Sequence, residues 1–491
     1  MKDFSKYFDK YNADAILLQS SDDFTFEHRS DSVMSYLTGF SGTAGEAILT
    51  KNGKIFLFVD PRYHIQASNS AKEGVQVVKM QLGETFIKIL PQYLDINSKL
   101  LIDEKFIKFD VYENIKKVFK NTTSADFVNR YPKILSNEKI DNSRIEKLKT
   151  KLKKYNFDNI FITNNEHVSY LTNINSFDLP YSSTIRAKLL IGDKNILIFD
   201  ETPEIFGKTL IFKDNLSLHD CKKVKEPILI KKNYVAEMMS VKSKKEIEGL
   251  KLSFQKLDCA LHSFKKKIKV GLSEYELNKI FEEELFKAGA KALSFKTILS
   301  VDENTASIHY SSYDKNKFVK PNSLILLDCG GFWESPYATD ITRVFAVGDV
   351  TDEQKRIYTY VLKAFLNCYH SDFSKGFELD GLARSIFKKA KIKDFIFPHA
   401  LGHGLGLNVH SFPPSISPSG KSKLKKGMTF TIEPGLYLEN KFGIRLENSV
   451  YIGDDGIKHS FSKFPFEEKL IDKTLLTKKE IKYLEDWQNG R

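Results

Sequence analysis

Two aspartates in the second half of the chain have the type and the spacing expected of a metal site. Asp328 ends the apolar run 324–327, and Asp340 comes just before the strand-like segment 342–347. The segment between the two runs is typical of a hairpin, so both carboxylates can face the same point across neighbouring strands. Taken alone, an aspartate at a strand end is more often a turn or capping residue.

A glycine-rich segment further along the chain holds three histidines. Residues 397–410 read Phe-Pro-His-Ala-Leu-Gly-His-Gly-Leu-Gly-Leu-Asn-Val-His, which places the histidines at His399, His403 and His410. The three glycines allow the backbone to pass close to whatever the histidines bind. A lone histidine is more often a structural residue, but three in one short segment support the structural and the ligand roles equally.

Two glutamates follow in strand-like segments. Glu433 ends the alternating run 427–432, and the Pro-Gly pair after it stops the strand. In 443–450, alternation predicts one strand that directs Arg445 and Glu447 to the same face. The structural alternatives are a turn carboxylate for Glu433 and a salt bridge on the strand for Arg445 and Glu447.

The argument for a metal site rests on these residues as a set. Four carboxylates and an imidazole would lie at or in apolar strands and a glycine-rich turn, and each unpaired buried charge costs several kcal/mol. Four carboxylates balance the charge of two divalent cations. An oxygen-rich set of ligands with one imidazole suits Mn, Fe, Co or Zn, so the ligands do not identify the metal.

In the order Asp, Asp, His, Glu, Glu, these residues resemble the ligands of the pita-bread metallopeptidases, and within them those of the aminopeptidase P group. The resemblance covers nearly the whole chain. It implies an α+β protein with two creatinase-like α/β N-terminal domains, residues 1–137 and 138–233, followed by a pita-bread catalytic domain, residues 234–491. It also implies the metal ligands: Asp328 for one metal, His403 and Glu433 for the other, and Asp340 and Glu447 as bridges.

The same resemblance implies roles for further side chains. His309 corresponds to a histidine on the substrate side, His399 to a pocket histidine, and Arg445 to a partner of the ligands. His410 corresponds to the histidine that stabilises the tetrahedral intermediate or moves a proton. Between Asp328 and Asp340 the chain has one residue more than the family pattern, which predicts a longer hairpin tip.

The activity implied by the resemblance is hydrolysis of the bond between an N-terminal residue and a following proline. Two divalent ions, with Mn²⁺ as the expected metal, would acidify a water to hydroxide near neutral pH and stabilise the oxyanion. Glu433 would hold and relay the proton. The expected substrates are peptides with proline at the second position, and a homodimer is expected.

The first 235 residues contain an internal repeat. Residues 11–16 (Tyr-Asn-Ala-Asp-Ala-Ile) are echoed by 155–160 (Tyr-Asn-Phe-Asp-Asn-Ile), and Ser-Tyr-Leu-Thr occurs at 35–38 and again at 169–172. Each copy continues with an apolar run that ends in aspartate, at 54–60 and 195–200. Two copies of one α/β unit are therefore predicted, joined near the charged stretch 137–154, which is typical of a helix.

The pattern changes after residue 239. Ser243 with Glu246, and Ser273 with Glu276, have the spacing of capping boxes, and each pair precedes apolar residues at helical intervals. Gly289 can end the second helix. Strand-like segments follow from residue 297 onward, so a helix-then-sheet α+β pattern is predicted for the last domain.

Composition narrows the class of protein. A chain of 491 residues predicts two to four domains, and no apolar run approaches the length of a signal peptide core or a membrane span, which favours a soluble, cytoplasmic protein without a membrane partner. The net charge of +12 comes from lysines spread along the chain, which favours a solvated surface over nucleic-acid binding. The four cysteines lie far apart and are expected to be reduced.

Two competing functions stay open at this point. A prolidase, which cleaves only Xaa-Pro dipeptides, would use the same five ligands, but the doubled N-terminal unit favours the aminopeptidase P group. A metal-free member of the fold that binds peptides or histones is the other alternative. Retention of all five ligand residues argues against it, because uncompensated buried carboxylates are costly.

Overall fold

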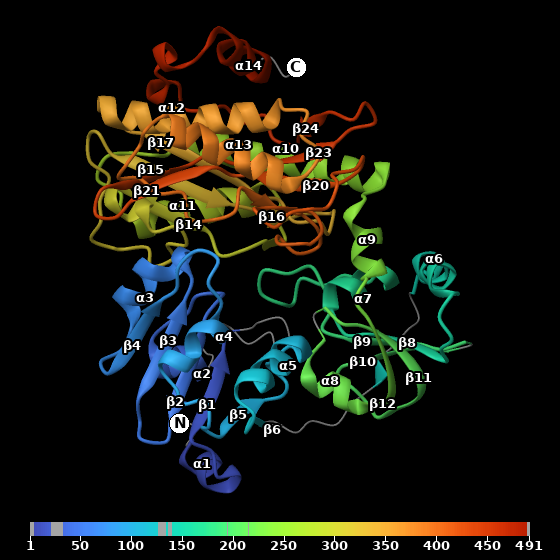
Figure 1. Ribbon diagram of the computed structural model, residues 1–491. Coiled ribbons are helices and arrows are strands. Elements are labelled where there is room, and N and C mark those ends of the chain that lie inside the picture. Colours follow the sequence, from blue (N-terminus) through green and yellow to red (C-terminus); the bar gives the residue numbers. More distant parts are fainter. Residues whose placement is uncertain are drawn as a thin grey trace. The chain divides into compact units, whose positions relative to one another are not determined.

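The computed structural model describes residues 4–20, 33–125, 134–135, 140–193, 195–214 and 216–488, and its chain divides into two compact units (Figure 1). The first unit comprises Met1–Ile174 and Thr184–Val235. The second comprises Ala236–Arg491 together with the short segment Asn175–Ser183. The candidate ligands all belong to the second unit.

The first unit contains two six-stranded sheets whose inner strands are arranged alike, while the edge strand β4 is parallel to its neighbour and the edge strand β7 antiparallel. One sheet has the order β4-β3-β2-β1-β5-β6, and the other, read from its far edge, has the order β7-β10-β9-β8-β11-β12. In each, a central strand pairs antiparallel on one side and parallel on the other. The strands are β1 (Ala15–Gln19), β2 (Glu46–Thr50), β3 (Ile55–Val59), β4 (Val75–Lys79), β5 (Leu100–Asp103), β6 (Thr123–Ala125), β7 (Ile134–Leu135), β8 (Asn159–Ile162), β9 (Lys188–Ile191), β10 (Ile196–Phe199), β11 (Ile205–Phe212) and β12 (Val224–Ile230).

The predicted repeat corresponds to this doubled design. The echoed motifs at 11–16 and 155–160 lead into the central strands β1 and β8, and the two Ser-Tyr-Leu-Thr segments lie in helices α2 and α7. The division of the two copies at residue 137 remains a prediction, because residues 136–139 lie outside the described part of the chain. The helices of this half are α1 (Ser5–Tyr11), α2 (Val33–Thr38), α3 (His64–Ser70), α4 (Phe86–Ile89), α5 (Phe109–Val118), α6 (Ser143–Leu152), α7 (Asn165–Thr172), α8 (Leu218–Lys223) and, at the boundary with the second unit, α9 (Tyr234–Ser240).

The second unit begins with the two helices that the sequence predicts. Both capping boxes are confirmed, with Ser243 before α10 and Ser273 before α11, and Gly289 has a positive φ of 85° after α11 ends. Helix α12 follows a third capping box, at Thr351. The helices are α10 (Lys244–Lys265), α11 (Glu274–Lys287), α12 (Asp352–Tyr369), α13 (Gly376–Lys389) and α14 (Lys478–Gln488).

Short antiparallel sheets make up the rest of this unit, and Figure 1 shows them between α12 and α13 on one side and α11 on the other. The sheets are β14-β15-β17, β20-β23-β24, β21-β22, β13-β16 and β18-β19. Their strands are β13 (Ala292–Leu293), β14 (Ile298–Val301), β15 (Leu324–Cys329), β16 (Gly331–Phe332), β17 (Ile341–Ala346), β18 (Gly402–His403), β19 (Ser415–Ile416), β20 (Thr429–Ile432), β21 (Gly435–Leu438), β22 (Phe442–Arg445), β23 (Asn448–Ile452) and β24 (Lys458–Ser460).

The hairpin predicted between the two aspartates is present. Strands β15 and β17 pair in continuous antiparallel register up to Cys329 opposite Ile341, so the long tip does not shift the pairing. Gly330 is required at the start of the tip, since a Cβ there would lie 1.9 Å from the carbonyl oxygen of Thr339.

The prediction of one strand over 443–450 is wrong. The chain leaves β22 at Arg445 and enters β23 at Asn448, and these two strands belong to different sheets, paired with β21 and β20 respectively. Alternation cannot reveal such a switch, because Leu446 between the strands is buried and continues the apolar pattern. The break leaves Glu447 at a junction between sheets.

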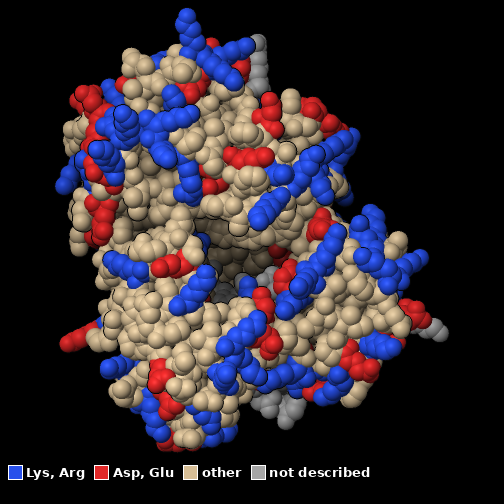
Figure 2. Space-filling model, viewed as in Figure 1, with Lys and Arg blue, Asp and Glu red and all other residues tan. Residues whose placement is uncertain are grey.

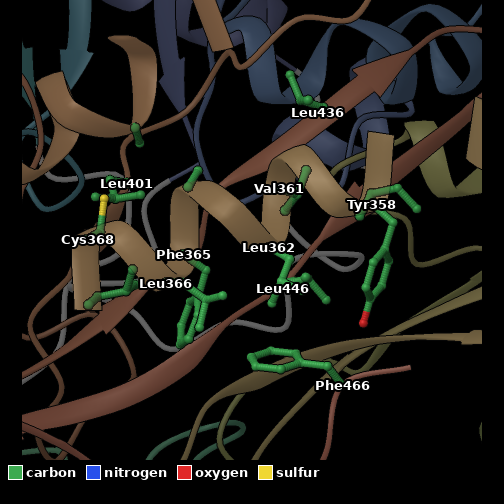
Figure 3. Close-up of a cluster of buried hydrophobic side chains, with 14 of the residues drawn as sticks. Tyr358, Val361, Leu362, Phe365, Leu366, Cys368, Leu401, Leu436, Leu446 and Phe466 are labelled. Atoms are coloured by element: carbon green, nitrogen blue, oxygen red, sulfur yellow. The ribbon is translucent and has the colours of Figure 1, made fainter. Parts of the chain in front are cut away.

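A hydrophobic core of the second unit lies between α12 and these sheets. Figure 3 shows Phe365 and Leu362 of α12 facing Leu446 and Phe466, with Leu401 near the end of the helix. The Phe365 ring also packs at 5.1 Å, centroid to centroid, from the indole of Trp487. This core fixes the loops that carry the candidate ligands.

Two surface properties bear on the class of protein. On the face shown in Figure 2, lysine and arginine side chains are interspersed with aspartate and glutamate, the pattern of a solvated surface. Among the described residues, no helix has both the length and the hydropathy needed to cross a lipid bilayer. The four cysteines are unpaired, and Cys329 and Cys368 are buried.

Replacing Phe365 with alanine should destabilise the second unit. Loss of a fully buried phenylalanine costs about 3–5 kcal/mol. Both tryptophans, Trp333 and Trp487, lie in this unit, so the midpoint of their fluorescence change in urea reports its unfolding. Phe373→Ala is the matched control, since Phe373 is exposed and should leave the midpoint nearly unchanged. Equal midpoints for the two variants would contradict this description of the core.

Candidate metal centre

Five strand ends and junctions bring the predicted ligands to one place. Asp328 lies in β15, Asp340 directly precedes β17, His403 lies in β18, Glu433 directly follows β20, and Glu447 lies between β22 and β23. Backbone hydrogen bonds link these elements. The amide of Glu447 donates to the carbonyl of Thr342 at 3.2 Å, and the amide of Glu433 donates to the carbonyl of Leu401 at 2.8 Å.

The ligand atoms of three of these residues converge. Asp340, His403 and Glu447 each offer an atom within 4.8 Å of the others. Nε2 of His403 lies 3.4 Å from Oδ2 of Asp340 and 3.5 Å from Oε1 of Glu433. These distances exceed those of good N–H···O bonds, as expected for atoms arranged around an ion rather than bonded to each other.

The other nitrogen of His403 fixes the role of the ring. Nδ1 lies 3.1 Å from the carbonyl oxygen of Gly404, which can only accept a hydrogen bond. This contact makes Nδ1 a donor, so Nε2 is the ring nitrogen available to a metal ion. Nε2 faces two carboxylates, an arrangement that suits a cation between them. The close approach depends on Gly404, where a Cβ would lie 2.0 Å from the carbonyl oxygen of Ser411.

Arg445 is the buried cation that the cluster already contains. Its Nη2 donates to Oδ2 of Asp328 at 2.7 Å, its Nη1 to the Tyr437 hydroxyl at 2.9 Å, and its Nε to Oγ1 of Thr342 at 3.1 Å. Thr342 in turn donates to Oε2 of Glu447 at 2.7 Å. The salt bridge between Arg445 and Glu447, given above as the structural alternative, is absent among the described ion pairs; Arg445 pairs with Asp328 and reaches Glu447 through Thr342.

Two carboxylates of the set each keep one oxygen without a protein donor. Oδ1 of Asp328 and Oε1 of Glu447 are buried and have no hydrogen-bond partner among the described residues, although their other oxygens are held by Arg445 and Thr342. An unsatisfied buried acceptor costs about 1–3 kcal/mol, and more if it is charged. Binding of a divalent cation would satisfy both atoms, so the residues present fit such ions.

The pKa values show the same excess of negative charge. Burial, followed by the charges of Asp328 and Glu433, raises the pKa of Asp340 well above its usual range. Burial and the neighbouring carboxylates, Asp340 first, likewise raise the pKa of Glu447. The pKa of Glu433 is also raised by burial, although the charges of His403 and Arg445 oppose the shift. Without a cation, these groups favour their protonated forms.

Two of the three accessory histidines lie beside the cluster. The exposed ring of His410 packs against the His403 ring at 4.3 Å, centroid to centroid, with the planes nearly perpendicular. His399 is buried, and its Nε2 accepts a hydrogen bond from the Tyr437 hydroxyl at 2.9 Å, because its Nδ1 donates to the carbonyl of Ala400.

His309 comes from a separate segment. It is half-buried and follows the 3₁₀ helix η4 (Asp302–Ala306). The amide of Gly443 in β22 donates to Oγ1 of Thr305 at 2.7 Å, which ties η4 to the strand that carries Arg445. The segment that precedes His309 is thus attached to the strand that carries Arg445.

Sequence reasoning missed Tyr437 and Thr342, which join the charged residues into one network. A signal for Tyr437 was present: it pairs with Gly443 across the β21–β22 hairpin, and a Cβ on Gly443 or on Gly435 would collide with its ring or hydroxyl. Glycines around a single tyrosine in this way indicate a side chain held in a fixed position. Thr342 gave no comparable signal.

Comparison with known proteins places this site in a family. The family description "Metallopeptidase family M24" matches residues 248–454, which include all five candidate ligands. A protein named Xaa-Pro dipeptidase from Pyrococcus furiosus is 32% identical, over 53% of this chain and 76% of that protein. The chain belongs to metallopeptidase family M24. The "Creatinase/Prolidase N-terminal domain" matches residues 1–132.

Relatives of similar length share the M24 domain and the N-terminal half. A protein named Xaa-Pro aminopeptidase 1 from Dictyostelium discoideum is 24% identical, over 93% of this chain and 86% of that protein. The crystal structure of an X-prolyl aminopeptidase from Caenorhabditis elegans, described as a cytosolic enzyme with a di-nuclear active site, has a TM-score of 0.85 at 23% identity. It covers 97% of this chain and 90% of that chain. The predicted α+β architecture, with creatinase-like N-terminal domains before a pita-bread catalytic domain, is confirmed.

Removing one carboxylate from the cluster should change the stability of the protein in opposite directions with and without metal. In chelator, Asp340→Asn relieves repulsion among buried carboxylates and should stabilise the protein by about 1–3 kcal/mol. With excess Mn²⁺ the wild type should be more stable than Asp340→Asn, because metal binding stabilises the wild type more. Thermal denaturation in the two buffers measures both effects.

The control for this comparison is Asp349→Asn, which removes a charge at an exposed position. It should change the stability little in either buffer. If Asp340→Asn destabilised the metal-free protein, the repulsion inferred for the cluster would be wrong.

Proposed function

We propose that this chain is an Xaa-Pro aminopeptidase that binds two divalent metal ions through Asp328, Asp340, His403, Glu433 and Glu447. The observation that carries the proposal is the cluster itself, in which ligand atoms of Asp340, His403 and Glu447 converge and oxygens of Asp328 and Glu447 lack a donor among the described residues. Binding of cations would stabilise such an arrangement. The M24 family supplies the class of reaction, peptide-bond hydrolysis.

Coverage of the relatives favours the aminopeptidase over a dipeptidase. The relative named Xaa-Pro aminopeptidase 1 aligns with 93% of the chain, including most of its doubled N-terminal half. The relative named Xaa-Pro dipeptidase aligns with 53% of the chain, despite its higher identity. The second α/β copy, for which we propose the bounds 138–233, thus accompanies the aminopeptidase.

The chain's own residues would perform the following steps. When bound, the two metal ions would lower the pKa of a water molecule and stabilise negative charge on the substrate carbonyl oxygen. Glu433 is the carboxylate suited to take the water proton, because its side chain is 18% exposed and burial raises its pKa. Arg445 donates to Oδ2 of Asp328 and so orients that carboxylate.

The histidines would act on the substrate. His410 is exposed beside His403, where its ring can donate to the tetrahedral intermediate or return a proton to the leaving proline nitrogen. The proline nitrogen carries no hydrogen before cleavage and the ring fixes φ, so a dedicated pocket has to receive it. We assign the proline pocket to the side of the site that holds His309 and His399.

Three finer points belong to the same proposal. We infer Mn²⁺ as the metal and a homodimer as the assembly, both from the resemblance to the aminopeptidase P group. We infer a cytoplasmic location, which four unpaired cysteines and the cytosolic relative from Caenorhabditis elegans support. Elemental analysis of the purified protein and light scattering test the first two.

Peptide cleavage tests the proposed activity. The purified chain should cleave an Xaa-Pro-Pro tripeptide after its first residue, lose this activity in chelator and regain it with Mn²⁺. Cleavage of an Xaa-Pro dipeptide alone would identify a prolidase instead. The absence of metal-dependent cleavage of either peptide would refute the enzyme hypothesis. His403→Ala should be inactive yet fold, with a thermal transition close to that of the metal-free wild type.

Replacing His410 should affect the chemical step without removing the metals. His410→Ala is expected to lower kcat by about 100-fold or more, as for loss of a general acid or base, with two metal ions still bound per chain. His459→Ala is the matched control and should keep full activity, because His459 is a half-buried histidine elsewhere in the catalytic half that pairs with Asp455. If His410→Ala lost its metals, His410 would be a ligand or a structural support of the ligands.

A further inference from the structure

A fully buried carboxylate lies next to the segment that carries His309. Glu274 occupies the first turn of α11 and has an exposed fraction of 0%. It has no role in the capping box of that helix, where Glu276 bonds to Ser273. Such a buried charge is costly unless donors surround it, so its partners indicate why it is there.

Glu274 accepts four hydrogen bonds from one stretch of chain. Its Oε1 accepts from the amide of Val301 at 2.7 Å and from Nδ2 of Asn304 at 3.0 Å. Its Oε2 accepts from the Tyr310 hydroxyl at 2.5 Å and from the amide of Asp314 at 3.0 Å. Two donors precede His309 in the sequence and two follow it. A single carboxylate therefore ties both sides of the segment to α11.

Glu274, Asn304 and Tyr310 are hydrogen-bonded to one another, and together they enclose the residues between 304 and 310. Nδ2 of Asn304 also donates to the Tyr310 hydroxyl at 3.1 Å, so both ends of the stretch 304–310 meet each other as well as Glu274. Burial and the bond to Glu274 raise the pKa of Tyr310, which keeps its hydroxyl protonated as a donor at neutral pH. His309 is the residue directly before Tyr310.

Within this segment the amides of Ser307 and Tyr310 donate to the carbonyls of Asn304 and Ser307, and further contacts attach it to neighbouring strands. Asp302 accepts from the amide of Leu324 at 2.9 Å, at the start of β15, and Thr305 bonds to Gly443 of β22. The Tyr313 hydroxyl donates to the carbonyl of Thr297. These contacts attach the segment to the sheets of the metal centre. The position of His309 within it depends on the Glu274 contacts.

We propose that Glu274 is a positioning residue, which holds His309 at the substrate side of the site by anchoring Asn304, Tyr310 and the flanking backbone. The proposal rests on the proposed function, because His309 would contact the substrate of that reaction. Glu274 itself lies behind this segment, fully buried, and would act only through it. The interaction sets the placement of one side chain, and a displacement of about 1 Å at such a position can cost about 100-fold in rate.

The substitution Glu274→Gln disrupts this anchor with little change in size. All four partners donate to Glu274, so whichever way a glutamine turned, its NH₂ group would face the amide of Val301 or that of Asp314. Neither backbone amide can accept a hydrogen bond. Glu276→Gln is the matched control: it lies in the same turn of α11, but its carboxylate bonds to Ser273.

A double-mutant cycle separates positioning from general damage. Glu274→Gln should lower kcat/KM for an Xaa-Pro-Pro tripeptide by about 10- to 100-fold, whereas Glu276→Gln should lower it less than about twofold. In a His309→Ala background, Glu274→Gln should add less than about twofold, because the side chain it positions is gone. Losses that multiply in the double variant would overturn the proposal.

Hydrogen exchange gives a readout that does not depend on activity. Amides in 301–314 should exchange faster in Glu274→Gln than in the wild type or in Glu276→Gln, and unchanged exchange would also overturn the proposal. If Glu274→Gln fails to fold, Tyr310→Phe removes one of the four bonds and should increase amide exchange in the same segment by a smaller amount. A wild-type chain that cleaves no Xaa-Pro peptide would instead refute the proposed function, while exchange still decides whether Glu274 anchors the segment.

Discussion

Repulsion among clustered carboxylates is the constraint that organises the catalytic half of this protein. Asp328, Asp340 and Glu447 are buried, Glu433 is half-buried, and folding brings them together from strand ends and junctions far apart in the sequence. Arg445 pairs with the carboxylate of Asp328, and a second buried guanidinium, that of Arg343, donates to the backbone carbonyl of Glu447. Two positive charges do not balance four carboxylates, and the remaining excess of negative charge suits divalent cations.

Hydrogen bonds from the surrounding structure orient Asp328, His403 and Glu447 of the proposed ligand set. Thr342 joins Arg445 to Glu447, Tyr437 joins Arg445 to His399, and the carbonyl of Gly404 sets the tautomer of His403. Such partners reduce the cost of organising ligands at the moment of binding. The core around Phe365 includes residues next to the proposed ligands, so the same packing contacts contribute to stability and to the geometry of the site.

Much of the site could be predicted from local sequence, and the missing parts have a common physical origin. The Asp328–Asp340 hairpin and the capping boxes at Ser243 and Ser273 depend on residues close in sequence, so patterns and spacing reveal them. The change of sheet at Leu446 and Glu447 is set by tertiary pairing, and it leaves no trace in the alternation. Thr342 and Glu274 were missed for the same reason, since their partners lie in other elements.

The central claim is that the five residues hold two metal ions, and anomalous diffraction from crystals grown with Mn²⁺ tests it most directly. Two anomalous peaks should lie within the cluster, one against Asp328 and one against His403 and Glu433, with Asp340 and Glu447 contacting both. A single peak, or peaks away from these five side chains, would contradict the account.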